Sequence, residues 1–136
     1  MRKFGLLLLP LALAGCQTWG PTWSEVSGAR WNIPSAQFNT VPTTINKIDG
    51  TSALQTVPGY PGTVKIEPGD HSIELSAPPL SPGWTGGTAL ETMQLKVEPC
   101  KRYYINGTYA NPLGMEWKPF VDYVDTIAGC TVVAAK

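Results

Sequence analysis

The chain has 136 residues, with ten basic and ten acidic side chains that balance to a formal net charge of zero at pH 7. This length fits one domain built around one hydrophobic core. Without Arg2 and Lys3, which lie in a cleavable leader described below, eight basic and ten acidic residues remain. No basic field is left to hold a phosphate backbone, so the composition argues against nucleic-acid binding.

The first 15 residues have the three-part pattern of a secretory signal peptide. Arg2 and Lys3 form a basic start, residues 4–14 form an apolar run, and Gly15 precedes Cys16. A transmembrane helix needs about 20 apolar residues, so this run is too short to be one. We therefore predict a signal peptide over residues 1–15.

The tetrapeptide Leu13-Ala14-Gly15-Cys16 resembles a bacterial lipobox. The resemblance implies that Cys16 receives a diacylglycerol, that the preceding peptide is removed, and that the new amine is acylated, for example with palmitate. Several acyl chains on one residue exceed the two signals needed for stable membrane anchoring. Gln17 stands where aspartate would signal inner-membrane retention in enteric bacteria, so we expect the outer membrane, on its periplasmic side. An ordinary signal peptide with an incidental cysteine is the alternative.

Cys100 and Cys130 remain as an even pair in an oxidising compartment, which predicts a disulfide between them. Zinc is a weaker alternative, because it requires about four ligands and the single histidine, His71, is distant in sequence. No metal or other cofactor is expected.

Residues 16–40 are predicted to be a lipidated amino terminus and tether, and residues 41–136 a folded domain. The tether contains Trp19, Trp23 and Trp31 among glycine, proline, serine and threonine. We expect some of these tryptophans to dock on the domain, while one could rest at the bilayer interface.

Short strands and turns follow in the domain, and no helical pattern of ten residues is present. Residues 43–48 form a β-branched strand that ends at the turn dipeptide Asp49-Gly50. Residues 64–76 form a predicted hairpin around Pro68-Gly69-Asp70, with His71, Ile73 and Leu75 on one face. Residues 77–87 form a long loop with three prolines and three glycines. Further strands are predicted over residues 90–97, 102–109, 117–124 and 131–133.

Pro119 indicates an edge or a bulge in the strand over residues 117–124. Six to eight short strands at this spacing predict an all-β fold, an antiparallel β-sandwich of the immunoglobulin or transthyretin type.

Residues 45–130 are similar to PEGA-type and related carboxypeptidase-regulatory-like domains of proteobacterial lipoproteins. The similarity rests on Asp49-Gly50, on Pro68-Gly69-Asp70-His71 and on Tyr103-Tyr104. It implies a β-sandwich that serves as a binding or structural module and has no catalytic residues. The chain departs from the pattern at Glu67-Pro68-Gly69-Asp70, where a PEGA sequence has Pro-Glu-Gly-Ala.

The residues offer little for catalysis, and we expect no enzyme. His71 follows a turn, where a hydrogen bond to a backbone carbonyl is the simplest role for its ring. Glu116, Asp122 and Asp125 could act in glycoside hydrolysis, but solvated acids on a strand have the same pattern. No nucleophile elbow or phosphate-binding loop is present.

Trp84, in the loop over residues 77–87, is the best candidate for a contact site, because exposed loop aromatics often mark binding surfaces. The alternative is that Trp84 folds back and caps the sandwich. The sequence therefore predicts a lipid-anchored envelope protein that acts as a binding or scaffold module. An accessory outer-membrane lipoprotein of a secretion or pilus assembly, and a periplasmic inhibitor or saccharide binder, are alternatives.

Overall fold

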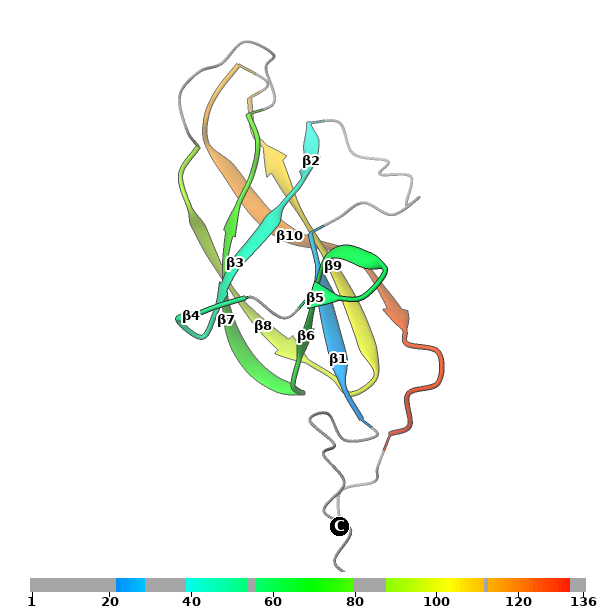
Figure 1. Cartoon of the computed structure of the whole chain (residues 1–136). Helices are drawn as coiled ribbons and strands as arrows, with labels where there is room; N and C mark the ends of the chain where they lie inside the picture. The colour runs from blue at the N-terminus through cyan, green and yellow to red at the C-terminus, as the bar shows by residue number, and fades with distance from the viewer. Residues whose placement is uncertain (1–21, 29–38, 54–55, 80–87, 112, 133–136) are drawn as a thin grey trace, which may run out of the picture.

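The computed structural model describes residues 22–28, 39–53, 56–79, 88–111 and 113–132, which contain ten strands and no helix. The strands form two layers around one core (Figure 1). Their bounds are β1 (Ser24–Ser27), β2 (Thr40–Pro42), β3 (Thr44–Ile48), β4 (Thr51–Ser52), β5 (Thr56–Val57), β6 (Tyr60–Ile66), β7 (Gly69–Ser76), β8 (Glu91–Val97), β9 (Lys101–Tyr109) and β10 (Trp117–Thr126).

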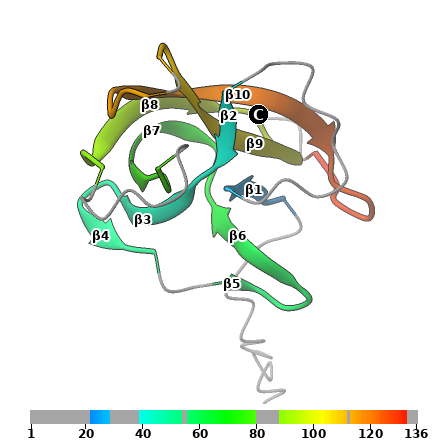
Figure 2. The same ribbon diagram turned by 90° about the horizontal axis from the view of Figure 1, so that it is seen from above.

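The six-stranded sheet, here sheet A, has the order β10-β9-β1-β6-β5, with β2 also paired to β9. The four-stranded sheet, sheet B, has the order β4-β3-β7-β8. Figure 2 shows both sheets curving around the space that the core side chains fill. The core consists of alternate residues from both sheets, as a sandwich requires: Val26, Val41, Ile45, Val64, Ile66, Ile73, Leu75, Ala77, Leu95, Val97, Tyr103, Ile105, Tyr109 and Trp117.

The fold confirms most of the strands expected from the sequence. The predicted segments over residues 43–48, 90–97, 102–109 and 117–124 correspond to β3, β8, β9 and β10. The structure has ten strands rather than six to eight because the short strands β1, β2, β4 and β5 were not expected. Residues 131 and 132 are not in a strand, so the last predicted strand is absent where the structure describes it.

Pro119 lies on an edge strand, as its missing N–H predicts. Within the described residues β10 is the outermost strand of sheet A, and its register against β9 shifts between Val121 and Tyr123. A proline and a bulge are both devices that discourage pairing with another strand.

The predicted hairpin over residues 64–76 is wrong. β6 pairs with β1 and β5 in sheet A, whereas β7 pairs with β3 and β8 in sheet B. The turn between them is a corner that carries the chain from one sheet to the other. Gly69 has φ 130°, a value that L side chains rarely adopt, so glycine lets the chain bend here. Alternation in the sequence is the same for a hairpin and for two strands that face each other across a core.

The predicted tether over residues 16–40 is also wrong for residues 24–27 and 40, which lie in strands. β1 lies between β6 and β9, with all four residues buried (Figure 1). Its pairing with β9 is parallel, so the sheet is mixed rather than purely antiparallel. The sequence Ser-Glu-Val-Ser has no apolar alternation that would predict a strand. These residues are buried because strands lie on both sides of them.

Candidate functional site

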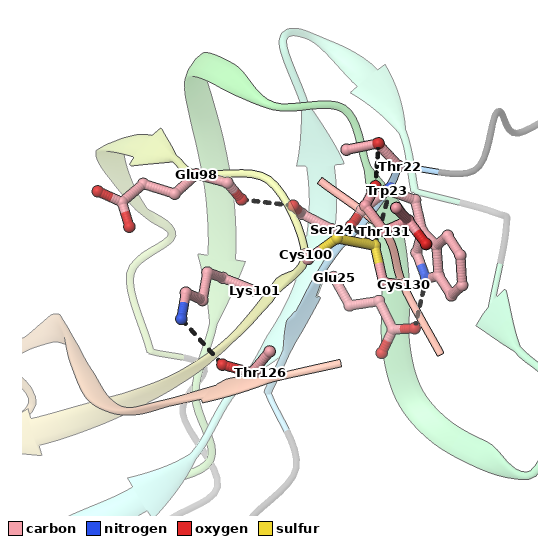
Figure 3. The surroundings of a disulfide bond; sticks show 10 residues. All are labelled: Thr22, Trp23, Ser24, Glu25, Glu98, Cys100, Lys101, Thr126, Cys130 and Thr131. Atoms are coloured by element: carbon pink, nitrogen blue, oxygen red, sulfur yellow. Dashed lines mark hydrogen bonds between the residues drawn. A yellow bond between two sulfur atoms is a disulfide. The ribbon is translucent and has the colours of Figure 1, made fainter. Parts of the chain in front are cut away.

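The disulfide predicted from the sequence is present and joins Cys100 to Cys130, with Cα atoms 5.5 Å apart (Figure 3). Cys100 follows β8 and opens β9, and Cys130 follows β10. The Cys100 N–H donates to the Trp23 carbonyl at 3.0 Å, and the Ile127 N–H donates to the Cys100 carbonyl at 2.9 Å. Thr22 also donates to the carbonyl of Thr131. The disulfide therefore fixes the point where the entry to β1, the start of β9 and the segment after β10 meet.

Four charged side chains form one row across the outer face of sheet A. The strand register places Asp125 beside Arg102, Arg102 beside Glu25, and Glu25 beside Lys65. These residues come from β10, β9, β1 and β6, and their charges alternate along the row. Opposite charges on neighbouring strands stabilise a sheet, and this row pairs β1 with both of its neighbours.

The Glu25–Arg102 pair is the most buried part of this row. Arg102 Nε donates to Glu25 Oε2 at 2.6 Å, and the side chains are 15% and 3% exposed. Trp23 Nε1 donates to the other carboxylate oxygen at 3.1 Å. Burial alone lowers the pKa of Arg102, but hydrogen bonds to Glu25 and Tyr104 outweigh it and hold the pKa above its ordinary value. Arg102 therefore stays charged and matches the acceptor-only carboxylate.

Aromatic rings surround this row on the same face. The Tyr60 ring lies over the Arg102 guanidinium, 5.0 Å from centroid to Cζ, and the Tyr104 and Tyr123 centroids are 5.9 Å apart. Tyr104 accepts a 3.5 Å contact from Arg102 Nη1 and donates a 3.4 Å contact to Asp125. Burial first, and the nearby Asp125 carboxylate to a smaller extent, keep the pKa of Tyr104 above its usual value, so it remains a neutral hydroxyl.

His71 connects three segments at the corner between the sheets. Its Nδ1 lies 2.6 Å from Asp49 Oδ2 and its Nε2 lies 2.7 Å from the Glu67 carbonyl oxygen. The second contact confirms the expected bond to a backbone carbonyl, while the contact with the Asp49 carboxylate was not expected. Both partners only accept hydrogen bonds, so each ring nitrogen meets an acceptor. His71, on the inner strand β7, thus ties the turn after β3 to the corner before β7.

We expect the variant Asp49→Asn to lose less stability in acid than the wild type does. The Ser72 N–H, at 2.8 Å, and then the His71 ring hold the pKa of Asp49 below its usual 3.8. A lowered pKa in the folded state stabilises the fold above the unfolded pKa, and this contribution is lost as the pH falls through the folded pKa. The difference between wild type and variant should therefore shrink below about pH 4.

Melting temperatures measured from pH 6 to pH 2 test this expectation. The control is Asp70→Asn, since Asp70 is exposed and has no side-chain hydrogen bond within the described residues. If the melting temperatures of wild type and Asp49→Asn differ by the same amount at every pH, the ionised Asp49 carboxylate contributes nothing to the pH dependence of stability.

The structure places the other sequence candidates as follows. Cys16 and Trp84 lie outside the described residues, as do Trp19 and Trp31. Trp23 docks on the domain through its bond to Glu25. The three acids do not act together: Asp122 accepts from Asn106 Nδ2 at 2.7 Å, Asp125 faces Arg102, and Glu116 is exposed.

Glu25, Arg102, Tyr60, Tyr104 and Tyr123 were missed as a group by the sequence interpretation. Residues 101–109 do alternate, with Arg102, Tyr104 and Asn106 on the outer side, so a polar face could have been noticed. Nothing in the sequence indicated that residues 24–27 would pair beside it.

Comparison of the chain with protein-family models, curated proteins and solved structures gives no match. In the part of the chain that the structure describes, no helix could span a membrane and no three His, Cys, Asp or Glu side chains are grouped to hold a metal ion.

Proposed function

We propose that the protein is a non-enzymatic, lipid-anchored binding or scaffold module of the cell envelope, held in the outer membrane through Cys16 and facing the periplasm. The observation that carries this proposal is the tetrapeptide Leu13-Ala14-Gly15-Cys16 after a basic and apolar start. A disulfide between Cys100 and Cys130 supports it, because such bonds persist in exported proteins.

The distance between the anchor and the domain also supports this proposal. Thr22 is the first described residue, six positions after Cys16, and it bonds to Thr131 near the disulfide. A fully extended chain spans at most about 3.6 Å per residue, so Thr22 can lie no more than about 22 Å from the lipidated cysteine. The disulfide end of the sandwich would therefore face the membrane, and the opposite end, where β7 and β9 finish, would face the periplasm.

We further infer that the sandwich belongs to the PEGA-like and immunoglobulin- or transthyretin-like group. Two facing sheets with a disulfide support this inference, and the mixed pairing of β1 sets this domain apart within such a group.

Replacing Cys16 by serine is expected to abolish incorporation of an alkyne-labelled palmitate analogue and to leave an uncleaved precursor. Gln17→Ala is the matched control and should be labelled and cleaved as the wild type is. Gln17→Asp should remain labelled but move to the inner-membrane fraction. Persistent labelling of Cys16→Ser would contradict the anchor, and an unchanged location of Gln17→Asp would contradict the sorting argument.

A further inference from the structure

The outer face of sheet A carries exposed aromatic side chains, which the pairing of its strands does not require. Two tyrosines stand half exposed on it, Tyr60 at 45% and Tyr123 at 48%, while the inward-facing Tyr103 and Tyr109 are 7% and 2% exposed. Arg102, Tyr104 and Asp125 lie between the two exposed rings, in the contacts given above. We call Tyr60, Arg102, Tyr104, Tyr123 and Asp125 the outer-face array.

Polar atoms of this face remain without partners in the described part of the chain. Asn106 Oδ1 and Asp125 Oδ1 are buried and accept no hydrogen bond. Asn106 is fully buried, and it lies on the same side of β9 as Tyr104, two residues further along. These two atoms are closed to solvent, whereas the Asp125 side chain as a whole is 32% exposed, so Asp125 rather than Asn106 is the acceptor that a ligand hydroxyl could approach.

The charges of the face select against an ionic ligand. Asp125, Arg102, Glu25 and Lys65 alternate in sign and sum to zero. Asp122, which accepts from Asn106, and Lys118, which the register places beside Thr108, add one charge of each sign. The closest pair, Glu25 and Arg102, is already joined at 2.6 Å. A ligand with a net charge would find no opposing field here, whereas a neutral ligand that both donates and accepts hydrogen bonds would match.

We propose that the outer-face array binds a neutral saccharide chain, with sugar rings lying on Tyr60 and Tyr123 and hydroxyl groups donating toward Asp125. The apolar face of a pyranose ring fits a flat aromatic ring, and its equatorial hydroxyls point sideways toward polar neighbours. The array offers both elements on one sheet face: two accessible rings, with a guanidinium, a phenol and a carboxylate between them. This proposal rests on the proposed function, because it names the ligand of the envelope module.

The test uses the full-length protein in detergent micelles and two probes, the β-1,4-linked hexamers of N-acetylglucosamine and of glucose. Calorimetric titration should show binding of at least one hexamer. Tyr123→Ala and Tyr60→Ala should each weaken it about tenfold, the size of effect expected for loss of one ring contact. Tyr123→Phe keeps the ring and should bind within about twofold of wild type.

Leu113→Ala is the matched control, because Leu113 is 84% exposed but lies in the loop between β9 and β10, away from the array. Thermal melts of each variant separate loss of the ring from loss of the fold. Binding that survives both tyrosine-to-alanine replacements overturns the location, and absence of binding to both hexamers and to purified sacculi overturns the ligand class. A photo-crosslinker at position 123 that captures only protein in cells would show a protein partner instead.

The result of the saccharide-binding test does not depend on whether Cys16 carries a lipid. Saccharide binding by the purified protein can succeed while palmitate labelling of Cys16 fails, and the reverse result is equally visible. Failure of the saccharide proposal is therefore distinguishable from failure of the proposed envelope location.

Discussion

Replacing Glu25 by glutamine is expected to lower the free energy of unfolding by about 2–4 kcal/mol. Loss of one partner from a buried ion pair costs about 3–5 kcal/mol, and we reduce this range because Arg102 keeps 15% exposure. Both oxygens of the Glu25 carboxylate accept hydrogen bonds, one from Trp23 Nε1 and one from Arg102 Nε. In glutamine an NH2 group, which only donates, replaces one of these oxygens, so one of the two donors loses its acceptor.

Urea unfolding followed by tryptophan fluorescence measures this change. Glu98→Gln is the matched control, since Glu98 is an exposed carboxylate at the same end of the molecule and points away from Glu25 (Figure 3). The control should remain within about 0.5 kcal/mol of wild type. If Glu25→Gln unfolds at the same urea concentration as Glu98→Gln, the pair does not hold β1 in place.

Removing the disulfide with the double replacement of Cys100 and Cys130 by serine is expected to cost about 3.7 kcal/mol. The two cysteines are separated by 30 residues, and closing a loop of that length restricts the unfolded chain by this amount in the chain-entropy model. A typical domain has only about 5–15 kcal/mol of stability, so the loss is large. The segment after β10 should suffer first, because Ile127 and Cys130 hold it to the sheet.

Hydrogen exchange of the reduced and the oxidised wild-type protein gives the same comparison without a mutation. Faster exchange should begin in residues 127–132 and at the entry to β1, where Cys100 N–H bonds to Trp23. Cys16→Ser is the control, because it leaves both structural cysteines in place. Equal stability of the oxidised and reduced forms would mean that the hydrogen bonds around Cys100 suffice.

Much of sheet B could be predicted from the sequence, because its strands have their own alternating pattern or end at a turn dipeptide. β8 alternates polar and apolar residues from Thr92 to Val97, and β7 pairs with β8 over seven consecutive positions. Asp49-Gly50 marked the turn after β3, and both residues have positive φ, the conformation that this dipeptide favours. Each of these signals is local, so neighbouring residues suffice to read it.

The role of His71 was only half predictable. A ring directly after a turn predicted the bond to a backbone carbonyl, and the Glu67 carbonyl accepts it. Asp49 lies 22 residues away in the sequence, and only the pairing of β3 with β7 brings its carboxylate to the ring.

By itself, the sequence determined the all-β class and the pairing of Cys100 with Cys130, because strand and turn patterns and the cysteine count need no coordinates. Only the tertiary structure decided that β6 and β7 belong to different sheets and that residues 24–27 form a central strand. The physical reason is that β1 is buried by strands 36 or more residues distant in the chain, as the Thr63–Ser27 bond across this separation illustrates. The outer face of sheet A, and with it the row from Asp125 to Lys65, exists only once those distant strands lie side by side.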